Sequence, residues 1–245
     1  MKDCISILDG EFQIVPVTPN MYDEVEELLV SISVNEEFGC LITNLRKSPL
    51  AIGELRKLIR YILSLGLSYA IRHVESGRIV SGIANIIFNV KRRSSYYDVR
   101  AQMKSPNMIK YMMLWDAVDS SFDVNEYFKM DSTIDVEYLG TLPDFRRRGL
   151  ANILCQHSID SARLMARGHL PPEVFARLPE EMQIERPRAV VTVATSPTAR
   201  KMGHSLGMTA VHKWTFSELR NLGGIITEPV DGESNQYVEL QVIEI

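Results

Sequence analysis

Close cysteine pairs, long apolar runs and excess positive charge are all missing from this chain of 245 residues. Its three cysteines, Cys4, Cys40 and Cys155, form an odd set without the spacing of a zinc site, so neither a disulfide framework nor a metal site is expected. No apolar run is long enough to cross a bilayer, and the first four residues do not resemble a secretory signal. We therefore expect a cytoplasmic protein with no bound metal and no membrane partner.

The charge balance and composition narrow the class of protein further. A net charge of −4 and a pI near 5.8 argue against non-specific nucleic-acid binding, which needs a basic surface, and they are compatible with amine substrates. Hydrophobic residues make up 45% of the chain, which is enough for a full core. The sequence has no internal repeat and no low-complexity segment, so it predicts a single domain over residues 1–245.

One stretch in the middle of the chain is the most informative. Residues 134–141 are rich in β-branched and aromatic side chains, which predicts a strand. Pro143 and Asp144 indicate a turn, and a helix is expected from about Arg147 to Arg167. The residues between the turn and the helix are therefore expected to lie at a helix N-terminus.

Three arginines and a glycine occupy that junction. Arg146, Arg147 and Arg148 face the positive end of the helix macrodipole, where cations are unfavourable. The same end carries unpaired N–H groups that bind anions, and Gly149 leaves the backbone bare for the close approach of a ligand. The pattern is typical of a polyphosphate site, whereas an arginine-rich turn on its own is more often a solvated helix start.

Two motifs resemble those of a known family. The Arg-x-x-Gly-x-Ala spacing from Arg146 to Ala151, directly after a strand, resembles the acetyl-CoA loop of the GCN5-related N-acetyltransferases (the GNAT superfamily). Ser196-x-x-Ala199, followed by the Leu-Gly-Met run that starts at Leu206, is similar to that family's second motif, with serine in place of its asparagine. The resemblance covers nearly the whole chain. It implies an α/β fold with a mixed, splayed sheet of about seven strands and helices on both faces.

The resemblance also implies acetyl-CoA (coenzyme A) as co-substrate. In the family, the strand before the loop leaves backbone N–H groups free to polarise the thioester carbonyl, and the loop amides hold the pyrophosphate of coenzyme A. The residues that this implies for acetyl-CoA binding are Leu139, Gly140, Thr141, Arg146, Arg147, Arg148, Gly149, Leu150, Ala151 and Ser196.

The remaining segments fit the same layout. Helices are expected to open near Thr18 and Ala51, and Pro16 places the first long strand at a sheet edge. A helical insertion over about 91–130 and a surface insertion over about 168–188 enlarge the core fold, and Asp231-Gly232 is expected in the last loop. The other strands are expected at residues 12–17, 67–74, 79–90, 189–194, 208–216 and 237–243.

Within the superfamily the chain most resembles the invertebrate aralkylamine and dopamine N-acetyltransferases. The run from Thr195 to Met202 is similar to their Ser/Thr-rich segment, and residues 35–38 stand where they carry an Asp-Glu-Pro-Leu motif, here without the proline. The glutamate of that motif is their proposed base, so the resemblance implies first Glu37 and then Glu36. Asp135 follows, because it lies at the register where histone-type relatives place a catalytic glutamate. Each of these side chains is equally consistent with an ordinary exposed or capping carboxylate.

Two further groups bear on the proton transfers. Glu137 shares a strand face with Asp135 by the period of two, so it is also a candidate base. Gly203 stands where many members of the family carry a tyrosine that protonates the departing thiolate. Ser196 and Thr198, with the neighbouring threonine, are expected to donate a proton or hydrogen bond instead.

These features predict direct acetyl transfer from acetyl-CoA to a small primary amine, with an aralkylamine such as dopamine, tyramine or serotonin favoured. The alternatives are a polyamine or protein N-acetyltransferase and, in a different class, a domain that binds acyl-CoA without turnover. We expect a monomer or weak dimer without a nucleic-acid partner.

Overall fold

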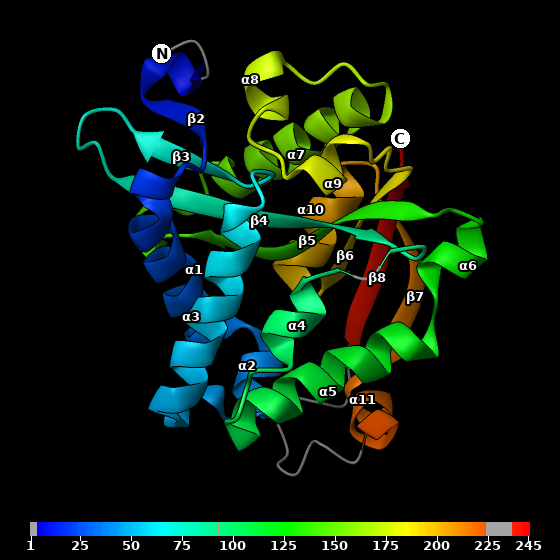
Figure 1. Cartoon of the computed structure of the whole chain (residues 1–245). Coiled ribbons are helices and arrows are strands. Elements are labelled where there is room, and N and C mark those ends of the chain that lie inside the picture. Colours follow the sequence, from blue (N-terminus) through cyan, green and yellow to red (C-terminus); the bar gives the residue numbers. More distant parts are fainter. Residues whose placement is uncertain (1–3, 93, 224–236) are drawn as a thin grey trace.

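One mixed sheet runs through the molecule (Figure 1). The computed structural model describes residues 4–92, 94–223 and 237–245, so the expected Asp231-Gly232 loop lies outside the described residues. The sheet order is β1-β2-β3-β4-β5-β6-β8-β7, and its neighbouring strands are antiparallel except for the parallel pair β5 and β6. The strands are β1 (Ile5–Ile7), β2 (Phe12–Pro16), β3 (Tyr69–His73), β4 (Ile79–Asn89), β5 (Ser132–Thr141), β6 (Ala189–Ala194), β7 (Thr209–Thr215) and β8 (Tyr237–Glu244).

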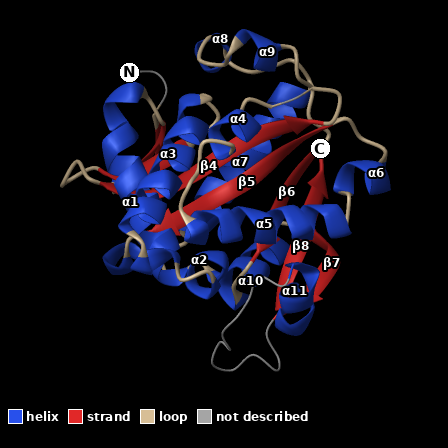
Figure 2. Cartoon of the chain, turned by 60° about the horizontal axis from the view of Figure 1, so that its bottom comes forward, coloured by secondary structure: helices blue, strands red, loops and turns tan. Residues whose placement is uncertain are grey.

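Helices cover both faces of this sheet, as the blue and red layers of Figure 2 show. The longer ones are α1 (Tyr22–Glu36), α3 (Pro49–Ser64), α5 (Pro106–Ser121), α7 (Leu150–Ala166), α10 (Pro197–Ser205) and α11 (Phe216–Gly223). The single-turn helices are α2 (Phe38–Ile42), α4 (Tyr96–Arg100), α6 (Val124–Phe128), α8 (Pro172–Phe175) and α9 (Glu180–Gln183). Short 3₁₀ turns are η1 (Leu8–Gly10), η2 (Pro19–Met21), η3 (Leu45–Lys47) and η4 (Pro143–Phe145).

The α/β class and the mixed sheet agree with the sequence prediction, but the described sheet has eight strands rather than about seven. The additional strand, β1, has three residues, too few for an alternating pattern to be recognised. Its pairing with β2, from Ile5 opposite Ile14 to Ile7 opposite Phe12, shows that the predicted edge position of β2 is wrong. Pro16 lies beyond these pairs, which is why a residue without an N–H is tolerated there.

The two faces of the sheet are fixed by alternation along its central strands. Gly82 and Gly140 pair across β4 and β5, and a Cβ added to Gly140 would lie 2.6 Å from Ile32 of α1. Ile83, one residue further along β4, packs instead with Leu154 of α7. Because successive side chains of a strand point to opposite faces, α1 and α7 cover opposite sides of the sheet.

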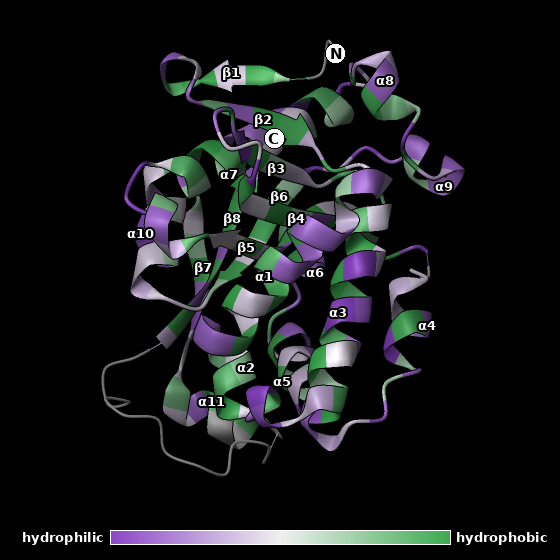
Figure 3. Cartoon of the chain, turned by 90° about the vertical axis from the view of Figure 1, so that its left-hand side faces the viewer, coloured by the Kyte–Doolittle hydropathy of each residue, from purple (hydrophilic) through white to green (hydrophobic). Residues whose placement is uncertain are grey.

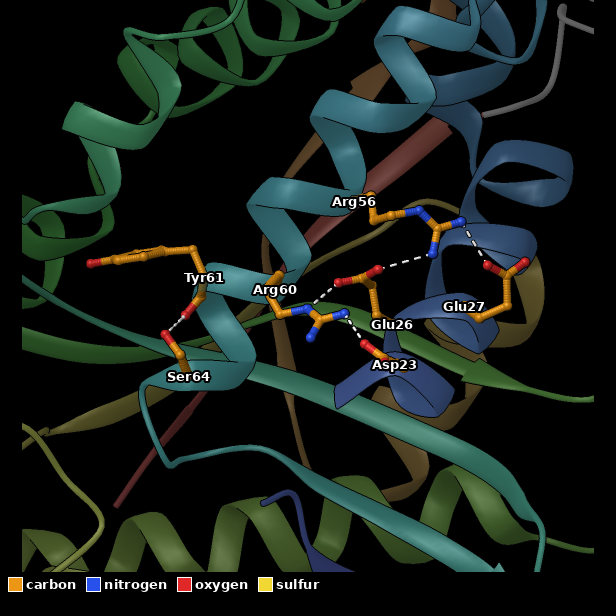
Figure 4. Close-up of polar contacts among 7 residues, drawn as sticks. All are labelled: Asp23, Glu26, Glu27, Arg56, Arg60, Tyr61 and Ser64. Carbon is orange, nitrogen blue, oxygen red and sulfur yellow. Dashed lines mark hydrogen bonds and ion pairs between the residues drawn. The ribbon is translucent and has the colours of Figure 1, made fainter. Parts of the chain in front are cut away.

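Charged side chains join the two long helices on the α1 face (Figure 4). The Glu26 side chain is only 4% exposed, and its carboxylate accepts hydrogen bonds from Arg56 (2.9 Å) and from Arg60. Arg60 also pairs with Asp23 at 2.5 Å, and Arg56 pairs with Glu27 at 2.6 Å. A buried carboxylate between two guanidinium groups holds α3 against α1, the helix whose C-terminal end leads into the site described below.

The distribution of apolar residues follows from this layering. Figure 3 shows hydrophobic strands enclosed by helices such as α3, which carries a hydrophilic outer side. Among the described residues, no helix has both the length and the apolar character that a membrane crossing requires. The helical segment over residues 91–130 contributes α4, α5 and α6, and α8 and α9 lie in the segment over residues 168–188.

Candidate active site

The site begins where two parallel strands separate. β5 and β6 pair only from Thr133 opposite Ala189 to Asp135 opposite Val191. Beyond this point β6 continues to pair with β8, while β5 continues to pair with β4. The sheet is therefore splayed along the C-terminal half of β5.

Backbone N–H groups of β5 face the resulting gap. The N–H of Leu142 donates to the carbonyl of Val80 at 2.9 Å, which fixes the phase of the hydrogen-bond ladder between β4 and β5. Because this ladder alternates, the N–H groups of Leu139 and Thr141 point away from β4 and towards the gap. Gly140 lies between them, and its lack of a side chain allows Ile32 of α1 to pack closely against the strand. Two of the three strand residues named from the sequence thus present free donors to the gap.

A cavity of about 640 Å³ passes through the gap between β5 and β6. From the α1 face it is lined by side chains such as Ser33, Tyr111 and Trp115. From the α7 face it is lined by side chains such as Cys155 and Ala199. The cavity therefore joins the two faces of the sheet beside the N–H groups of β5.

Among the carboxylic acids that line this cavity, Asp135 and Glu137 of β5 and Asp119 of α5 form an acidic cluster on the α1 face. Burial raises the pKa of Asp135 to about 7, against a hydrogen bond from Thr133, whose hydroxyl donates to it at 2.7 Å. Burial, with the nearby charges of Asp135 and Asp119, raises the pKa of Glu137 to about 8. Burial also raises the pKa of Asp119 to about 6. Burial in this low-dielectric cavity therefore moves the pKa values of all three acids towards neutral pH.

Arg100 of α4 is the cation that faces this acidic cluster. Its guanidinium lies over the rings of Tyr96 and Tyr97, at 5.5 and 5.8 Å from their centroids, and it pairs with Asp116 at 2.6 Å. The charge of Arg100 opposes the rise in the pKa of Glu137. Arg100 therefore offsets part of the negative charge that the ionised acids of this cluster carry.

Glu37 and Glu36, ranked first from the sequence, lie at the junction of α1 and α2 and both line the cavity. Glu37 is the N-cap of α2, and its two carboxylate oxygens accept the N–H groups of Gly39 (2.8 Å) and Cys40 (2.7 Å). Burial raises the pKa of Glu37, against these two hydrogen bonds. Glu36 is half-exposed and pairs with Arg146 at 2.6 Å. Both carboxylates therefore already have structural partners.

The loop that is expected to bind an anion consists of residues 146–151 and is called the anion loop here. It follows β5 and η4. The predicted helix start near Arg147 is wrong by three residues: Arg147 (φ 62°) and Gly149 (φ 77°) are left-handed, and α7 begins at Leu150. An added Cβ at Gly149 would meet no atom within 4 Å, so this residue faces open space. The first N–H groups of α7, including that of Ala151, have no intrahelical acceptor.

The arginines of this loop differ in their contacts. Arg146 donates through Nε to the carbonyl of Thr141 at 3.0 Å. Arg148 pairs with Glu11 and lies over the rings of Phe12 and Phe145. Arg147 is exposed and has no such ion pair or hydrogen bond in the described chain. It is the arginine that is most available to an anion at the start of α7.

The proposed proton donors separate in the structure. Ser196 lines the cavity and caps α10, where its hydroxyl accepts the N–H of Ala199 at 3.1 Å. Thr198 is exposed on α10 and does not belong to the cavity wall. Gly203 also lines the cavity, and a Cβ added there would lie 1.8 Å from the side-chain oxygen of Gln241 in β8. The structure brings Ser196, but not Thr198, to the cavity.

Sequence reasoning missed Asp119 and Arg100, which come from the segment over 91–130. Their only signal was the presence of charged residues within the helical insertion predicted over about 91–130, because the sequence does not show which residues of that insertion reach the site. No group of three or more His, Cys, Asp or Glu residues suited to hold a metal ion is found in residues 4–92, 94–223 and 237–245.

Comparison with known proteins identifies the fold. No protein-family model matches the sequence, and no curated protein matches it. The putative arylalkylamine N-acetyltransferase 7 of the yellow fever mosquito Aedes aegypti has a TM-score of 0.76 at 14% identity, over 98% of this chain and 92% of that one. Arylalkylamine N-acetyltransferase 2 of Aedes aegypti has a TM-score of 0.70 at 16% identity, over 96% and 99%.

A third structure resembles the chain in the same way. The polyamine N-acetyltransferase of Drosophila melanogaster, described as an enzyme that forms N-acetylagmatine, has a TM-score of 0.66 at 15% identity, over 96% of this chain and 100% of that one. The chain therefore has the fold of the GCN5-related N-acetyltransferases, as its two motifs predicted.

Proposed function

We propose that the protein is an acetyl-CoA-dependent N-acetyltransferase that transfers the acetyl group directly to a small primary amine. The observation that carries this proposal is the cavity that crosses the sheet where β5 leaves β6. Free N–H groups lie at its middle, the arginine-rich start of α7 follows β5, and acidic residues line its other side. These three features suit, in the same order, the thioester carbonyl of acetyl-CoA, the diphosphate of its coenzyme A part and the ammonium group of the amine.

The chain's own residues supply each task. The N–H groups of Leu139 and Thr141 are placed to stabilise the oxyanion that forms on the thioester carbonyl, and one such donor is worth about 3–4 kcal/mol in strong cases. Residues 146–151 offer N–H groups and arginines for the diphosphate of coenzyme A. Ser196 is placed to hydrogen-bond the departing thiolate. We propose no metal, because the backbone N–H groups and side chains named above can perform each of these tasks.

The substrate class follows from the lining on the α1 face. Aromatic side chains there, among them Phe88, Tyr96 and Tyr97, suit the ring of an aralkylamine such as tyramine, dopamine or serotonin. The cavity carboxylates suit its ammonium. The solved structures with this fold include both arylalkylamine enzymes and one that forms N-acetylagmatine, which supports an amine but leaves its class open.

An assay of acetyl transfer against tyramine, dopamine, serotonin, agmatine, spermidine and a lysine peptide tests the proposal. We expect the highest kcat/KM on an aralkylamine. A preference for agmatine or spermidine would assign a polyamine enzyme, and a preference for the peptide would assign a protein acetyltransferase. Tight acetyl-CoA binding without transfer to any amine would assign the remaining alternative, a domain that binds acyl-CoA without turnover.

A further inference from the structure

A β-bulge decides which β5 side chains reach the cavity. Ala84 pairs with Tyr138 and the next residue, Asn85, pairs with Val136, so Glu137 has no partner on β4. A strand with regular alternation would send neighbouring side chains to opposite faces. Because the bulge inserts one residue, Glu137 and Tyr138 both line the cavity on the α1 face. Bulges of this kind re-aim side chains next to functional sites.

The position of Glu137 along the strand is also informative. It precedes Leu139, whose N–H faces the gap, by two residues, which corresponds to about 7 Å of strand. An amine nitrogen that attacks a carbonyl held by that N–H lies between the two. The Glu137 side chain is therefore within reach of an ammonium at the reaction centre, directly or through one water molecule.

The other candidate bases are held by structural contacts. Both oxygens of Glu37 accept N–H groups of α2, and Glu36 pairs with Arg146 outside the acidic cluster. Asp135 accepts a hydrogen bond from the hydroxyl group of Thr133. For Glu137, no hydrogen bond or ion pair is found within the part of the chain that the structure describes, although it lines the cavity.

On this basis, and resting on the proposed function, we propose that Glu137 is the catalytic base that takes the proton of the substrate ammonium. The carboxylate of Glu137 accepts one proton from R–NH₃⁺, which leaves R–NH₂ with a free electron pair. That pair forms the C–N bond to the thioester carbon, and collapse of the oxyanion breaks the C–S bond. The second nitrogen-bound proton goes to the thiolate, so the products are the amide, the coenzyme A thiol and one proton on Glu137.

The surroundings of Glu137 tune it for this role. Burial raises its pKa most, Asp135 on β5 and Asp119 on α5 raise it further, and Arg100 on α4 lowers it. Tyr96 and Tyr138 are also close to Glu137. A base with a pKa near the working pH combines a useful ionised fraction with enough basicity to take the proton. The positive charge of an arriving ammonium favours the ionised form of Glu137.

The test compares a charged amine with a neutral one. Full-length Glu137→Gln is assayed with tyramine, whose amine is protonated at pH 7, and with methoxyamine, whose amine is already neutral at that pH. We expect a loss of at least about 100-fold in kcat on tyramine, the usual range for general base catalysis, and a loss of less than about 5-fold on methoxyamine. Glu126→Gln, an exposed carboxylate on α6, is the control and should leave both rates unchanged.

The outcomes separate the two proposals. No transfer by the wild-type protein to any amine would overturn the proposed function. An active wild type with an unimpaired Glu137→Gln variant, or one equally impaired on both amines, would overturn only the role of Glu137. Acetyl-CoA affinity of each variant, measured by calorimetry, should stay within about 2-fold of wild type. If Glu137→Gln fails to fold, Glu137→Asp keeps the carboxylate and should retain more activity on tyramine than Glu137→Ala.

Discussion

Arg146 and Glu36 are paired with each other: Nη2 of Arg146 lies 2.6 Å from a carboxylate oxygen of Glu36. The pair links the last residue of α1 to the turn that follows β5. Sequence patterns assigned these residues to different tasks, a base and an anion contact. The side chain of Arg146 is 37% exposed and that of Glu36 is 47% exposed, so the pair adds little to stability.

Gly149 provides a test of the anion loop. Gly149→Glu should abolish acetyl-CoA binding, because it adds a negative charge and a side chain where the diphosphate is proposed to lie. The domain should still fold, because an added Cβ meets no atom within 4 Å and only the left-handed φ of 77° is unfavourable. Gly149→Ala is the matched control for that strain, which is roughly 1 kcal/mol. Calorimetric titration with acetyl-CoA decides it, and unchanged affinity of the glutamate variant would refute the loop assignment.

Glu37 is expected to act on stability more than on catalysis. Glu37→Ala removes the acceptor of two α2 N–H groups and should lower the free energy of unfolding by about 1–2 kcal/mol. Glu37→Gln keeps an acceptor and should retain most of the turnover. Urea unfolding and steady-state assays of both variants measure the two effects. A loss of turnover in Glu37→Gln as large as that in Glu137→Gln would return Glu37 to the role of base.

The clamp between α1 and α3 predicts a contrast between adjacent glutamates. Glu26→Ala leaves Arg56 and Arg60 without their buried partner and should cost on the order of 3 kcal/mol of folding free energy. Glu27→Ala removes a carboxylate that is 64% exposed and should cost less than about 1 kcal/mol. Equal losses in urea unfolding would mean that the buried position of Glu26 is not what holds the helices together.

The acidic cluster should make stability depend on pH. Asp119, Asp135 and Glu137 have folded-state pKa values near 6, 7 and 8, above their ordinary values, so the folded chain binds protons more tightly than the unfolded chain. The protonation of these acids stabilises the folded chain. This stabilisation is complete below about pH 4 and is lost as the pH rises through the folded-state pKa values. We expect the free energy of unfolding to fall between pH 5 and 9.

The contribution of Glu137 to this decrease in the free energy of unfolding can be measured separately. A change of one pKa unit corresponds to about 1.4 kcal/mol, so the partly exposed Glu137 should account for on the order of 2 kcal/mol. Glu137→Gln cannot ionise and should flatten the profile by that amount in urea unfolding at pH 5, 7 and 9. A profile as steep as that of the wild type would show that Glu137 is not held protonated in the folded chain.

Local chemistry explains what could be predicted from the sequence. The strand over 134–141, the turn at Pro143 and the helix expected over about 147–167 each carry their own signals, and the structure contains all three, with the helix beginning at Leu150. The capping of α2 by Glu37 is also local, and its alternative reading as a capping carboxylate was visible in the sequence.

What could not be predicted depends on contacts between distant segments. The bulge that exposes Glu137 is a register shift against β4, more than 50 residues away in the chain. Asp119 and Arg100 enter the cavity from helices whose placement has no local signal. The space beside Gly203 is filled by the Gln241 side chain from the last strand, which no short motif encodes.

Direct acetyl transfer to an amine is tested by following coenzyme A thiol release from acetyl-CoA with and without tyramine, together with mass spectrometry of the amine. If the protein transfers acetyl groups to amines, thiol appears only with the amine and in a one-to-one ratio with N-acetyltyramine. Thiol release that does not depend on any amine of the panel, or none at all with acetyl-CoA bound, would contradict it.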